Sequence, residues 1–256
     1  MVSVQRAMLI TGAASGIGAA LARRVAAPGV GIVLHSGGST PDSTRRMRDV
    51  FAACAESGAE CVITEGDLAE VGVGAASVRT AIENFGRLDQ IVHAAGGVTK
   101  PLLGDLTRQQ FDRSIALMPG ALLDILTEAL PSLIASGAGR VVAVSSFIAH
   151  KMEPMSLAPA SAAAKAAMEA LVKCAALQLA PSGVTVNCVV PGFTRKDAGK
   201  TGALSAETWV LAAARTPTGR LNETDEVAAA IQFLLSTDAR QITGAMLNVD
   251  GGLMLG

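Results

Sequence analysis

Short runs of β-branched and other apolar residues alternate along this chain with longer stretches that are rich in alanine. A strand covered by helices on both faces is apolar along its whole length, and these runs have that character. Their alternation with helical segments is typical of parallel βαβ units. The pattern predicts an α/β fold, a three-layer doubly wound sheet with helices on both faces. Seven strands are expected near Ala7–Ile10, Gly31–His35, Glu60–Thr64, Leu88–His93, Arg140–Ser145, Val184–Val189 and Met246–Val249.

Local signals mark where two of the helices begin. Thr40 has the character of an N-cap, and Pro41 suits the first helical position that follows it. Thr107 and Gln110 have the spacing of a capping box at the start of a long central helix. Pro119 lies inside that helix, where proline removes a hydrogen bond and clashes with the preceding turn. The central helix is therefore predicted to be kinked.

Composition and charge narrow the class of protein. With 256 residues, half of them hydrophobic, the chain is expected to form one domain over residues 1–256. A net charge of -1 gives no field that would attract nucleic acid or an anionic membrane. Apolar stretches are interrupted by charges such as Lys165, so no segment is expected to span a membrane. Four scattered cysteines without metal-ligand spacing indicate reduced thiols, no metal and a cytoplasmic location.

A glycine-rich loop follows the first predicted strand. Residues 11–18 read Thr-Gly-Ala-Ala-Ser-Gly-Ile-Gly and open the next helix. Glycines allow the backbone to turn tightly and approach a pyrophosphate, whose charge then lies on the free N–H groups of the helix. A tight strand-to-helix turn without a ligand is the simpler interpretation. The position inside a βαβ pattern favours dinucleotide binding.

At this point the chain resembles the short-chain dehydrogenase/reductase superfamily, and within it the branch of the 3-oxoacyl-carrier-protein reductases. The likeness covers nearly the whole chain and implies a Rossmann fold. It rests on the glycine loop and on motifs that follow in the family's order, which are Gly66-Asp67-Leu68, His93-Ala94-Ala95-Gly96, Pro191-Gly192-Phe193-Thr194, Gly219-Arg220, Ile242-Thr243-Gly244 and Val249-Asp250-Gly251-Gly252. The family has Asn-Asn-Ala-Gly where this chain has residues 93–96, so two asparagines are missing.

The resemblance implies a nicotinamide dinucleotide as cofactor. The implied contacts are Gly12, Ser15, Gly16, Ile17, Gly18, Ser36, Asp67, Leu68, Ala94, Gly96, Lys165, Pro191, Gly192 and Thr194. A carboxylate after the second strand would select NAD, because it accepts a hydrogen bond from the ribose hydroxyl and repels a 2′-phosphate. Ser36 stands there instead, followed by two glycines, Ser39 and Thr40. This favours NADP over NAD, although the turn has no arginine, and Arg45 and Arg46 fit solvated positions on the next helix.

The family's catalytic tetrad is only half present. By resemblance, Ser146 polarises the substrate carbonyl and Lys165 is the catalytic lysine. The family's tyrosine position is Ser161, and the chain contains no tyrosine. The family's helix asparagine corresponds to Met118. An aliphatic hydroxyl is a much weaker acid than a phenol, so Ser161 would need a water fed by Lys165 to replace the tyrosine.

Other groups are candidates for the missing acid or for substrate contact. His150 lies in the expected substrate-facing loop of residues 147–152, and histidine is a common general acid. Lys165 itself is a second candidate acid. Arg195 and Lys196 follow the nicotinamide loop and suit an acidic substrate, although solvated loop charges are the better explanation. The loop Val98–Leu106 and the segment Lys196–Thr208 would line a small-molecule site without indicating a particular molecule.

Two functions of different class fit these residues. One is an NADP(H)-dependent oxidoreductase acting on a carbonyl or alcohol substrate with altered proton transfer. The alternative is a pseudoenzyme that binds dinucleotide or serves as a structural or regulatory partner. Non-redox chemistry in the nucleotide pocket is a third route. By resemblance, a homotetramer is expected through helices near Thr107–Ala135 and Ala158–Ala180, and the apolar stripe of Leu171, Ala175 and Leu179 fits either such an interface or the core.

Overall fold

The computed structural model describes residues 4–38, 40–195 and 205–255 of the chain. Its centre is a seven-stranded parallel sheet with the strand order β3-β2-β1-β4-β5-β6-β7. The strands are β1 (Arg6–Thr11), β2 (Val30–Ser36), β3 (Glu60–Glu65), β4 (Gln90–His93), β5 (Arg140–Val144), β6 (Thr185–Pro191) and β7 (Met246–Val249). The doubly wound α/β prediction is confirmed, and every predicted strand end lies within about two residues of the observed one.

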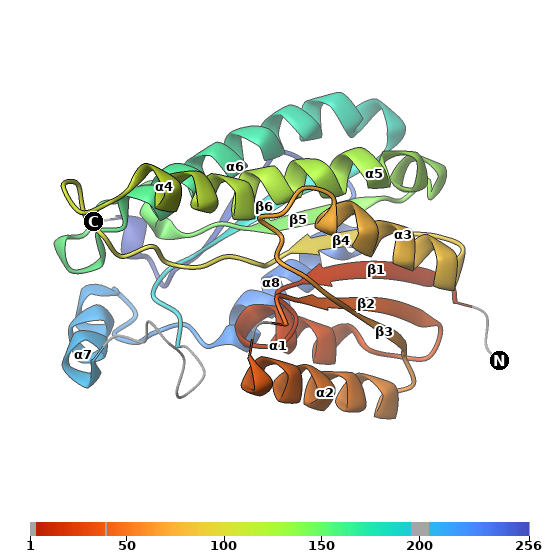
Figure 1. Cartoon of the computed structure of the whole chain (residues 1–256), viewed down its shortest axis with the longest axis horizontal. Coiled ribbons are helices and arrows are strands. Elements are labelled where there is room, and N and C mark those ends of the chain that lie inside the picture. The colour runs from red at the N-terminus through yellow and green to blue at the C-terminus, as the bar shows by residue number, and fades with distance from the viewer. Residues whose placement is uncertain (1–3, 39, 196–204, 256) are drawn as a thin grey trace.

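Helices cover both faces of this sheet (Figure 1). Their bounds are α1 (Gly16–Val25), α2 (Pro41–Glu56), α3 (Val73–Phe85), α4 (Arg108–Ile115), the π turn η1 (Ala116–Gly120), α5 (Ala121–Ala135), α6 (Pro159–Leu179), α7 (Ala206–Arg215) and α8 (Thr224–Leu235). Helices α1, α2 and α8 pack on one face, and α3, α4, α5 and α6 pack on the other. Each face buries its own apolar cluster, so the sheet separates two cores.

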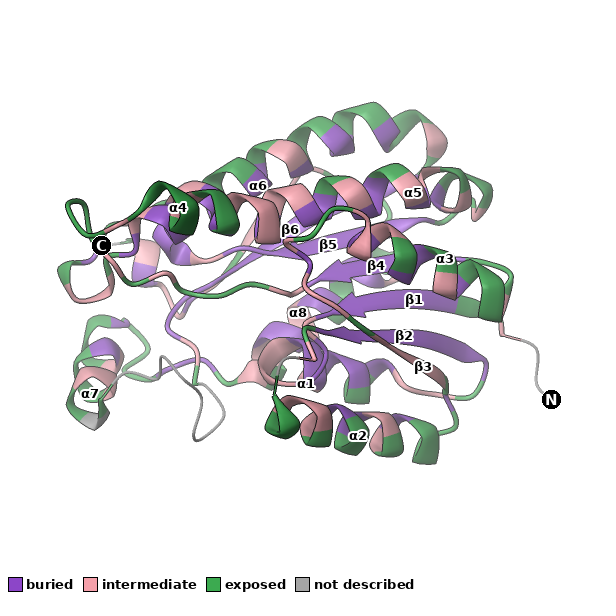
Figure 2. Ribbon diagram, in the orientation of Figure 1, coloured by how far each residue is buried: buried purple, intermediate pink, exposed green. Residues whose placement is uncertain are grey.

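The strands differ in burial according to their place in the sheet. Strands β1, β2, β4, β5 and β6 are buried almost throughout, as Figure 2 shows, whereas the edge strands β3 and β7 are only half-buried or exposed. The expectation that every strand is covered on both faces was therefore wrong for the two edges. An edge strand has one sheet neighbour and lies at the margin of the helix layers, so part of its surface meets solvent.

The central helix begins at the predicted capping box and is interrupted at the predicted proline. Thr107 and Gln110 make the reciprocal hydrogen bonds of a capping box, and Thr40 caps α2 through the N–H of Ser43. Pro119 lies within η1, so the interruption takes the form of a π turn between α4 and α5.

The continuous helical stretch Arg108–Ala135 has 28 residues, a mean hydropathy of 1.4 and the length of a membrane span. No segment was expected to span a membrane, because charges interrupt the apolar stretches, yet this helix is long and apolar enough by length and composition alone. Residues such as Met118, Leu122, Ile125 and Leu133 are buried in the cluster against the sheet. Core packing therefore accounts for the hydropathy of this helix.

The apolar stripe on α6, formed by Leu171, Ala175 and Leu179, faces the core. Ala175 and Leu179 are buried in the core cluster, and Leu171 packs against it. The interpretation of these three residues as a subunit interface is therefore wrong. The exposed positions on the same helix include Lys173, Cys174 and Leu177.

The order of the strands creates a switch point between β1 and β4. The chain leaves β1 for β2 and β3, returns to β4 on the other side of β1, and then continues to β7. Loops that follow β1 and β4 therefore diverge at the carboxyl edge of the sheet. In open α/β sheets, ligands bind in the crevice outside that edge.

Candidate active site

The glycine loop between β1 and α1 is shaped by contacts that exclude side chains. A Cβ on Gly12 would lie 3.0 Å from the backbone of Ala95, and Gly12 has a φ of +68°. A Cβ on Gly18 would lie 2.4 Å from the carbonyl oxygen of Gly12. Only glycine fits both positions. The loop therefore brings the first N–H groups of α1 to the switch point, where they suit a pyrophosphate.

The strand ends beside this loop are tied together by a buried hydrogen-bonded chain. Thr11 Oγ1 accepts a hydrogen bond of 3.1 Å from the N–H of Ala95 and lies 3.1 Å from His93 Nδ1. The contact between Oγ1 and Nδ1 links His93 to the backbone of Ala95 through the Thr11 hydroxyl. Burial, together with the charge of Lys165, lowers the pKa of His93 to about 3. His93 is therefore neutral at physiological pH.

Lys165 lies on α6 with its amine at the bottom of the site. Its Nζ donates a hydrogen bond of 2.6 Å to the carbonyl of Val144, at the end of β5. A Cβ on Gly96 would lie 3.2 Å from this Nζ and 3.6 Å from Met118 Sδ. Burial lowers the pKa of Lys165 to about 8, although Cys188 and Glu169 raise it. The amine therefore titrates close to neutral pH.

The two serines after β5 have different roles. Ser146 caps the short turn η2 (Phe147–Ala149), where its Oγ lies 3.5 Å from the N–H of Ile148. The hydroxyl of Ser145 donates to the Glu169 carboxylate, which also lies 2.9 Å from His150 Nε2. This buried carboxylate fixes the loop to α6. Glu169 was not predicted as a site residue, although its position one turn after Lys165 places it on the same helix face.

Ser161 is buried and 1% exposed, and its hydroxyl is directed to the backbone of the loop after β4. It accepts a hydrogen bond of 2.8 Å from the N–H of Thr99 and donates one of 3.3 Å to the carbonyl of Gly97. Thr99 Oγ1 is in turn 2.9 Å from the hydroxyl of Ser114 on α4. In this arrangement Ser161 joins α6 to the loop.

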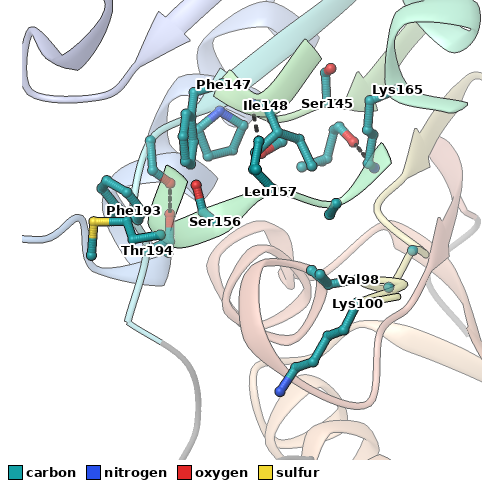
Figure 3. Close-up of a pocket in the computed structure, with 18 of the residues that line it drawn as sticks. Val98, Lys100, Ser145, Phe147, Ile148, Ser156, Leu157, Lys165, Phe193 and Thr194 are labelled. Atoms are coloured by element: carbon teal, nitrogen blue, oxygen red, sulfur yellow. Dashed lines mark hydrogen bonds between the residues drawn. The ribbon is translucent and has the colours of Figure 1, made fainter. Parts of the chain in front are cut away.

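A cavity of about 550 Å³ opens above Lys165 and Ser146. Figure 3 shows Phe147, Ile148, Leu157 and Phe193 gathered on one side, with Val98 and Lys100 on the other. The rings of Phe147 and Phe193 lie 4.6 Å apart, and Trp209 of α7 adds to this apolar wall. Of the expected cofactor contacts, the cavity is lined by Ile17, Ala94, Gly96, Lys165, Pro191, Gly192 and Thr194. Lys196 and residues up to 204 lie outside the described part of the chain.

A second, smaller cavity of about 180 Å³ adjoins the glycine loop on the side of α2. Ser15, Arg23, Arg46 and Asp49 are among its lining residues. Arg46 forms an ion pair of 2.5 Å with Asp42, and its side chain is only 27% exposed. The interpretation of Arg46 as a solvated surface residue was therefore wrong, because the helix turns this side chain toward the loop.

The turn after β2 contains the residue that was expected to select the cofactor. Ser36 is buried, and its Oγ lies 3.3 Å from the N–H of Gly38. A Cβ on Gly38 would lie 3.1 Å from the carboxylate of Glu65, so an acid from β3 lies beside this turn. Ser39, the next residue of the predicted phosphate-binding turn, lies outside the described residues.

The aspartate after β3 lies in a tight turn beside the switch point. Asp67 Oδ1 accepts a hydrogen bond of 3.0 Å from the N–H of Ala69, and Oδ2 lies 2.7 Å from Arg113 of α4. The backbone hydrogen bond and the Arg113 charge hold the pKa of Asp67 below its usual value. Leu68, which follows it, is buried.

The chain is similar to known oxidoreductases over nearly its whole length. The family model described as enoyl-(acyl carrier protein) reductase matches residues 12–254. The chain is 35% identical over 250 residues to cis-4-hydroxycyclohexanecarboxylate dehydrogenase of Sinomonas cyclohexanicum, covering 97% of this chain and 96% of that protein. It is 30% identical over 256 residues to L-rhamnose 1-dehydrogenase (NAD(P)(+)) of Azotobacter vinelandii, covering 100% of this chain and 99% of that protein.

Solved structures of oxidoreductases have the same fold. Acetoin dehydrogenase from Salmonella typhimurium superposes with a TM-score of 0.86 at 27% identity, covering 98% of this chain and 96% of that chain. Levodione reductase gives a TM-score of 0.86 at 26% identity, covering 99% of both chains.

Proposed function

Because the chain belongs to the short-chain dehydrogenase/reductase superfamily, whose members use nicotinamide dinucleotides, we propose that it interconverts a carbonyl compound and its alcohol with NADP(H). One observation carries this proposal. Ser146, Lys165 and the nicotinamide loop Pro191–Thr194 line one cavity, which reaches Ile17 at the glycine loop. A polarising hydroxyl, a titratable amine and a dinucleotide cradle therefore meet at one place.

The residues present fit the dinucleotide. Gly12 and Gly18 let the glycine loop pack directly against neighbouring backbone, the tight turn that a pyrophosphate site needs, and Gly96 lacks the side chain that would crowd Lys165. Pro191, Gly192 and Thr194 would hold the nicotinamide end, with Asp67 and Leu68 at the adenine end. When bound, the nicotinamide supplies or accepts the hydride.

The chain's own residues supply polarisation and a proton. We assign to Ser146 the hydrogen bond to the carbonyl oxygen. Among the described residues that line the cavity, Lys100 and Lys165 are the ionisable ones. A pKa of about 8 allows the Lys165 ammonium to give a proton to a developing alkoxide near neutral pH. Ser161 has its hydroxyl engaged with Thr99 and Gly97, which favours Lys165 as the proton source.

The apolar wall favours a small apolar ketone or secondary alcohol as substrate. Phe147, Phe193 and Trp209 offer aromatic surfaces, and no described lining residue carries a negative charge. One relative is named for an alicyclic hydroxy acid, and a structural neighbour is named a levodione reductase. Ring ketones are therefore the first substrates to test.

NADPH oxidation with a series of cyclic ketones tests the proposed activity. We expect turnover by the wild type and a loss of about 10²–10³-fold in kcat/KM in Ser146→Ala, the magnitude typical of one lost oxyanion donor. Ser156→Ala, which alters another cavity hydroxyl, is the matched control and should retain turnover within a few-fold. NADPH binding without turnover of any ketone or alcohol would instead indicate the pseudoenzyme.

The preference for NADP rests on Ser36 and on the two arginines of the smaller cavity. Arg23 and Arg46 lie beside the glycine loop, where they suit a 2′-phosphate, whereas the Glu65 carboxylate beside Gly38 opposes one. We expect Arg46→Ala to weaken NADPH binding about 10-fold in calorimetry and to leave NADH unchanged. Glu65→Gln should strengthen NADPH binding. Tighter binding of NADH by the wild type would contradict the preference.

We also propose that the protein is a single-domain homotetramer in the cytoplasm. Its contacts would use the outer faces of α5 and α6, where Leu123 and Leu177 are exposed. The core-facing residues of α6 are excluded from that role by their packing.

A further inference from the structure

The amine of Lys165 makes a single hydrogen bond within the described part of the chain. Among the described residues, the Val144 carbonyl is its one hydrogen-bond partner, and the lysine is 8% exposed. Its Nζ lies 3.2 Å from the position that a Cβ on Gly96 would occupy, and it lines the apolar cavity. The amine therefore lies at the base of the apolar cavity with one side open.

The opening exists because two neighbouring side chains leave it clear. Ser161, one helical turn before Lys165, directs its short side chain to Gly97 and Thr99 and does not line the cavity. Met118 lies over Gly96 with an apolar thioether and offers the amine no strong acceptor. Carbonyl compounds that enter the cavity therefore meet a primary amine.

We propose that Lys165 captures apolar ketones and aldehydes as Schiff bases when the nicotinamide end of the site is empty. This activity needs neither hydride transfer nor the cofactor, so it goes beyond the proposed oxidoreductase. Desolvation in an apolar pocket is one of the ways by which proteins make a lysine nucleophilic.

The groups around the amine suit this reaction. His93 is neutral, so it adds no positive charge, and Met118 is uncharged. Burial lowers the pKa of Lys165 to about 8 and outweighs Cys188 and Glu169, which raise it. A substantial fraction of the amine is therefore unprotonated in weakly alkaline buffer.

The bonds balance without an oxidant or a reductant. The nitrogen lone pair forms a C–N bond to the carbonyl carbon, and the C=O π pair moves to oxygen, which Ser146 polarises. A proton passes from nitrogen to that oxygen to give a carbinolamine. A second proton, taken from solvent, converts the carbinolamine hydroxyl to a leaving water while the nitrogen lone pair forms C=N, and the product is a protonated imine on Lys165.

Reductive trapping tests the proposal. Purified protein freed of nucleotide is incubated with cyclohexanone and sodium cyanoborohydride, which reduces an imine to a stable secondary amine. The adduct is located by peptide mass spectrometry among the six lysines of the chain. We expect labelling at Lys165 at least about 10-fold faster than at any other lysine, and saturating NADP⁺ should suppress it.

Two variants separate the site from general lysine reactivity. Lys165→Met should abolish the fast labelling, whereas Lys173→Met, which alters an exposed lysine on the same helix, should leave it unchanged. Protection by NADP⁺ reports on the site even if Lys165→Met folds poorly. Labelling of Lys165 no faster than that of Lys173 in well-folded wild type would overturn the proposal. This outcome is independent of whether the protein turns over NADPH.

Discussion

At the residue scale, Ser161, which the family resemblance assigns to the tyrosine position, has a structural role. Ser161 supports the loop after β4 through Thr99 and Gly97, and it is buried. In Ser161→Ala the N–H of Thr99 loses its partner, so we expect the free energy of unfolding to fall by about 1–2 kcal/mol. Chemical denaturation measures this change. Unchanged stability would show that the loop does not depend on Ser161.

Replacing Ser161 with tyrosine addresses catalysis at the same position. In Ser161→Tyr a phenol would lie one helical turn from Lys165, whose cation lowers the pKa of a neighbouring hydroxyl. Because general acid catalysis is commonly worth about 10²–10⁴-fold, we expect a clear rise in NADPH-dependent ketone reduction. Met118, in place of the family's asparagine, limits the gain by leaving the proton relay incomplete. A variant that binds NADPH equally well but reduces ketones no faster would show that the pocket has diverged.

The buried amine of Lys165 gives stability a specific pH dependence. Its pKa is about 8 in the folded protein and near 10.5 when exposed, so the unfolded chain binds the extra proton between those values. The unfolding free energy should therefore rise with pH in this window, by up to about 3 kcal/mol for this group. Denaturant titrations from about pH 7.5 to about pH 10 on wild type and Lys165→Met measure the difference. A difference that stays constant with pH would contradict the burial of a charged amine.

How far the sequence could specify the site depended on the kind of interaction. The resemblance to the family predicted that Ser146, Lys165 and the glycine loop meet, and they line or adjoin one cavity. It did not predict that Arg46 turns inward or that Glu169 bridges Ser145 and His150. Those contacts depend on side-chain direction and on residues far apart in the chain.

At the element scale, a substitution at the start of α1 tests whether stability and dinucleotide binding depend on the close packing of the glycine loop. Gly18→Ala would place a methyl group 2.4 Å from the carbonyl oxygen of Gly12, and backbone cannot yield as a flexible side chain can. We expect a loss of several kcal/mol in stability, typical of overpacking, and loss of dinucleotide binding. Gly37→Ala is the control for stability, because nothing lies within 4 Å of its Cβ position. Equal stability of both variants would refute the close-packing argument.

The sequence predicted features within one helix better than it predicted which elements that helix packs against. The capping box at Thr107 and the proline at 119 predicted where the central helix begins and is interrupted, since both act through local backbone geometry. The stripe of Leu171, Ala175 and Leu179 has the same period whether it faces a core or a subunit. Only the packing of α6 against the sheet distinguishes these cases.

At the scale of the whole molecule, the outer faces of α5 and α6 predict assembly. Leu177 is 81% exposed and Leu123 is 52% exposed on adjacent helices, and exposed apolar side chains of this kind favour association. We expect a tetramer by light scattering at micromolar concentration, and smaller species in Leu177→Lys. Val71→Lys, at an equally exposed apolar residue outside these helices, should leave the tetramer intact. A monomeric wild type would remove this part of the proposal.

The strand order places the residues of the candidate active site at the carboxyl edge of the sheet. Loops after β1, β4, β5 and β6 contribute the glycine loop, Gly96, Ser146 and Pro191–Thr194 to one crevice. The parallel topology brings together residues that lie far apart in the chain, because successive strands end at the same edge. The sequence order of the motifs predicted this arrangement, whereas the shape of the cavity depended on α7 and the loop after β5.

We propose that this chain transfers hydride between a nicotinamide and a carbonyl carbon without a tyrosine. The most direct measurement is isotope transfer from NADPH carrying deuterium at the transferred position, with cyclohexanone as acceptor and mass spectrometry of the alcohol. We predict cyclohexanol with one deuterium on the carbinol carbon from wild type, and at least about 100-fold less from Lys165→Met at equal NADPH saturation. Unlabelled alcohol, or no alcohol from a protein that binds NADPH, would contradict hydride transfer by this chain.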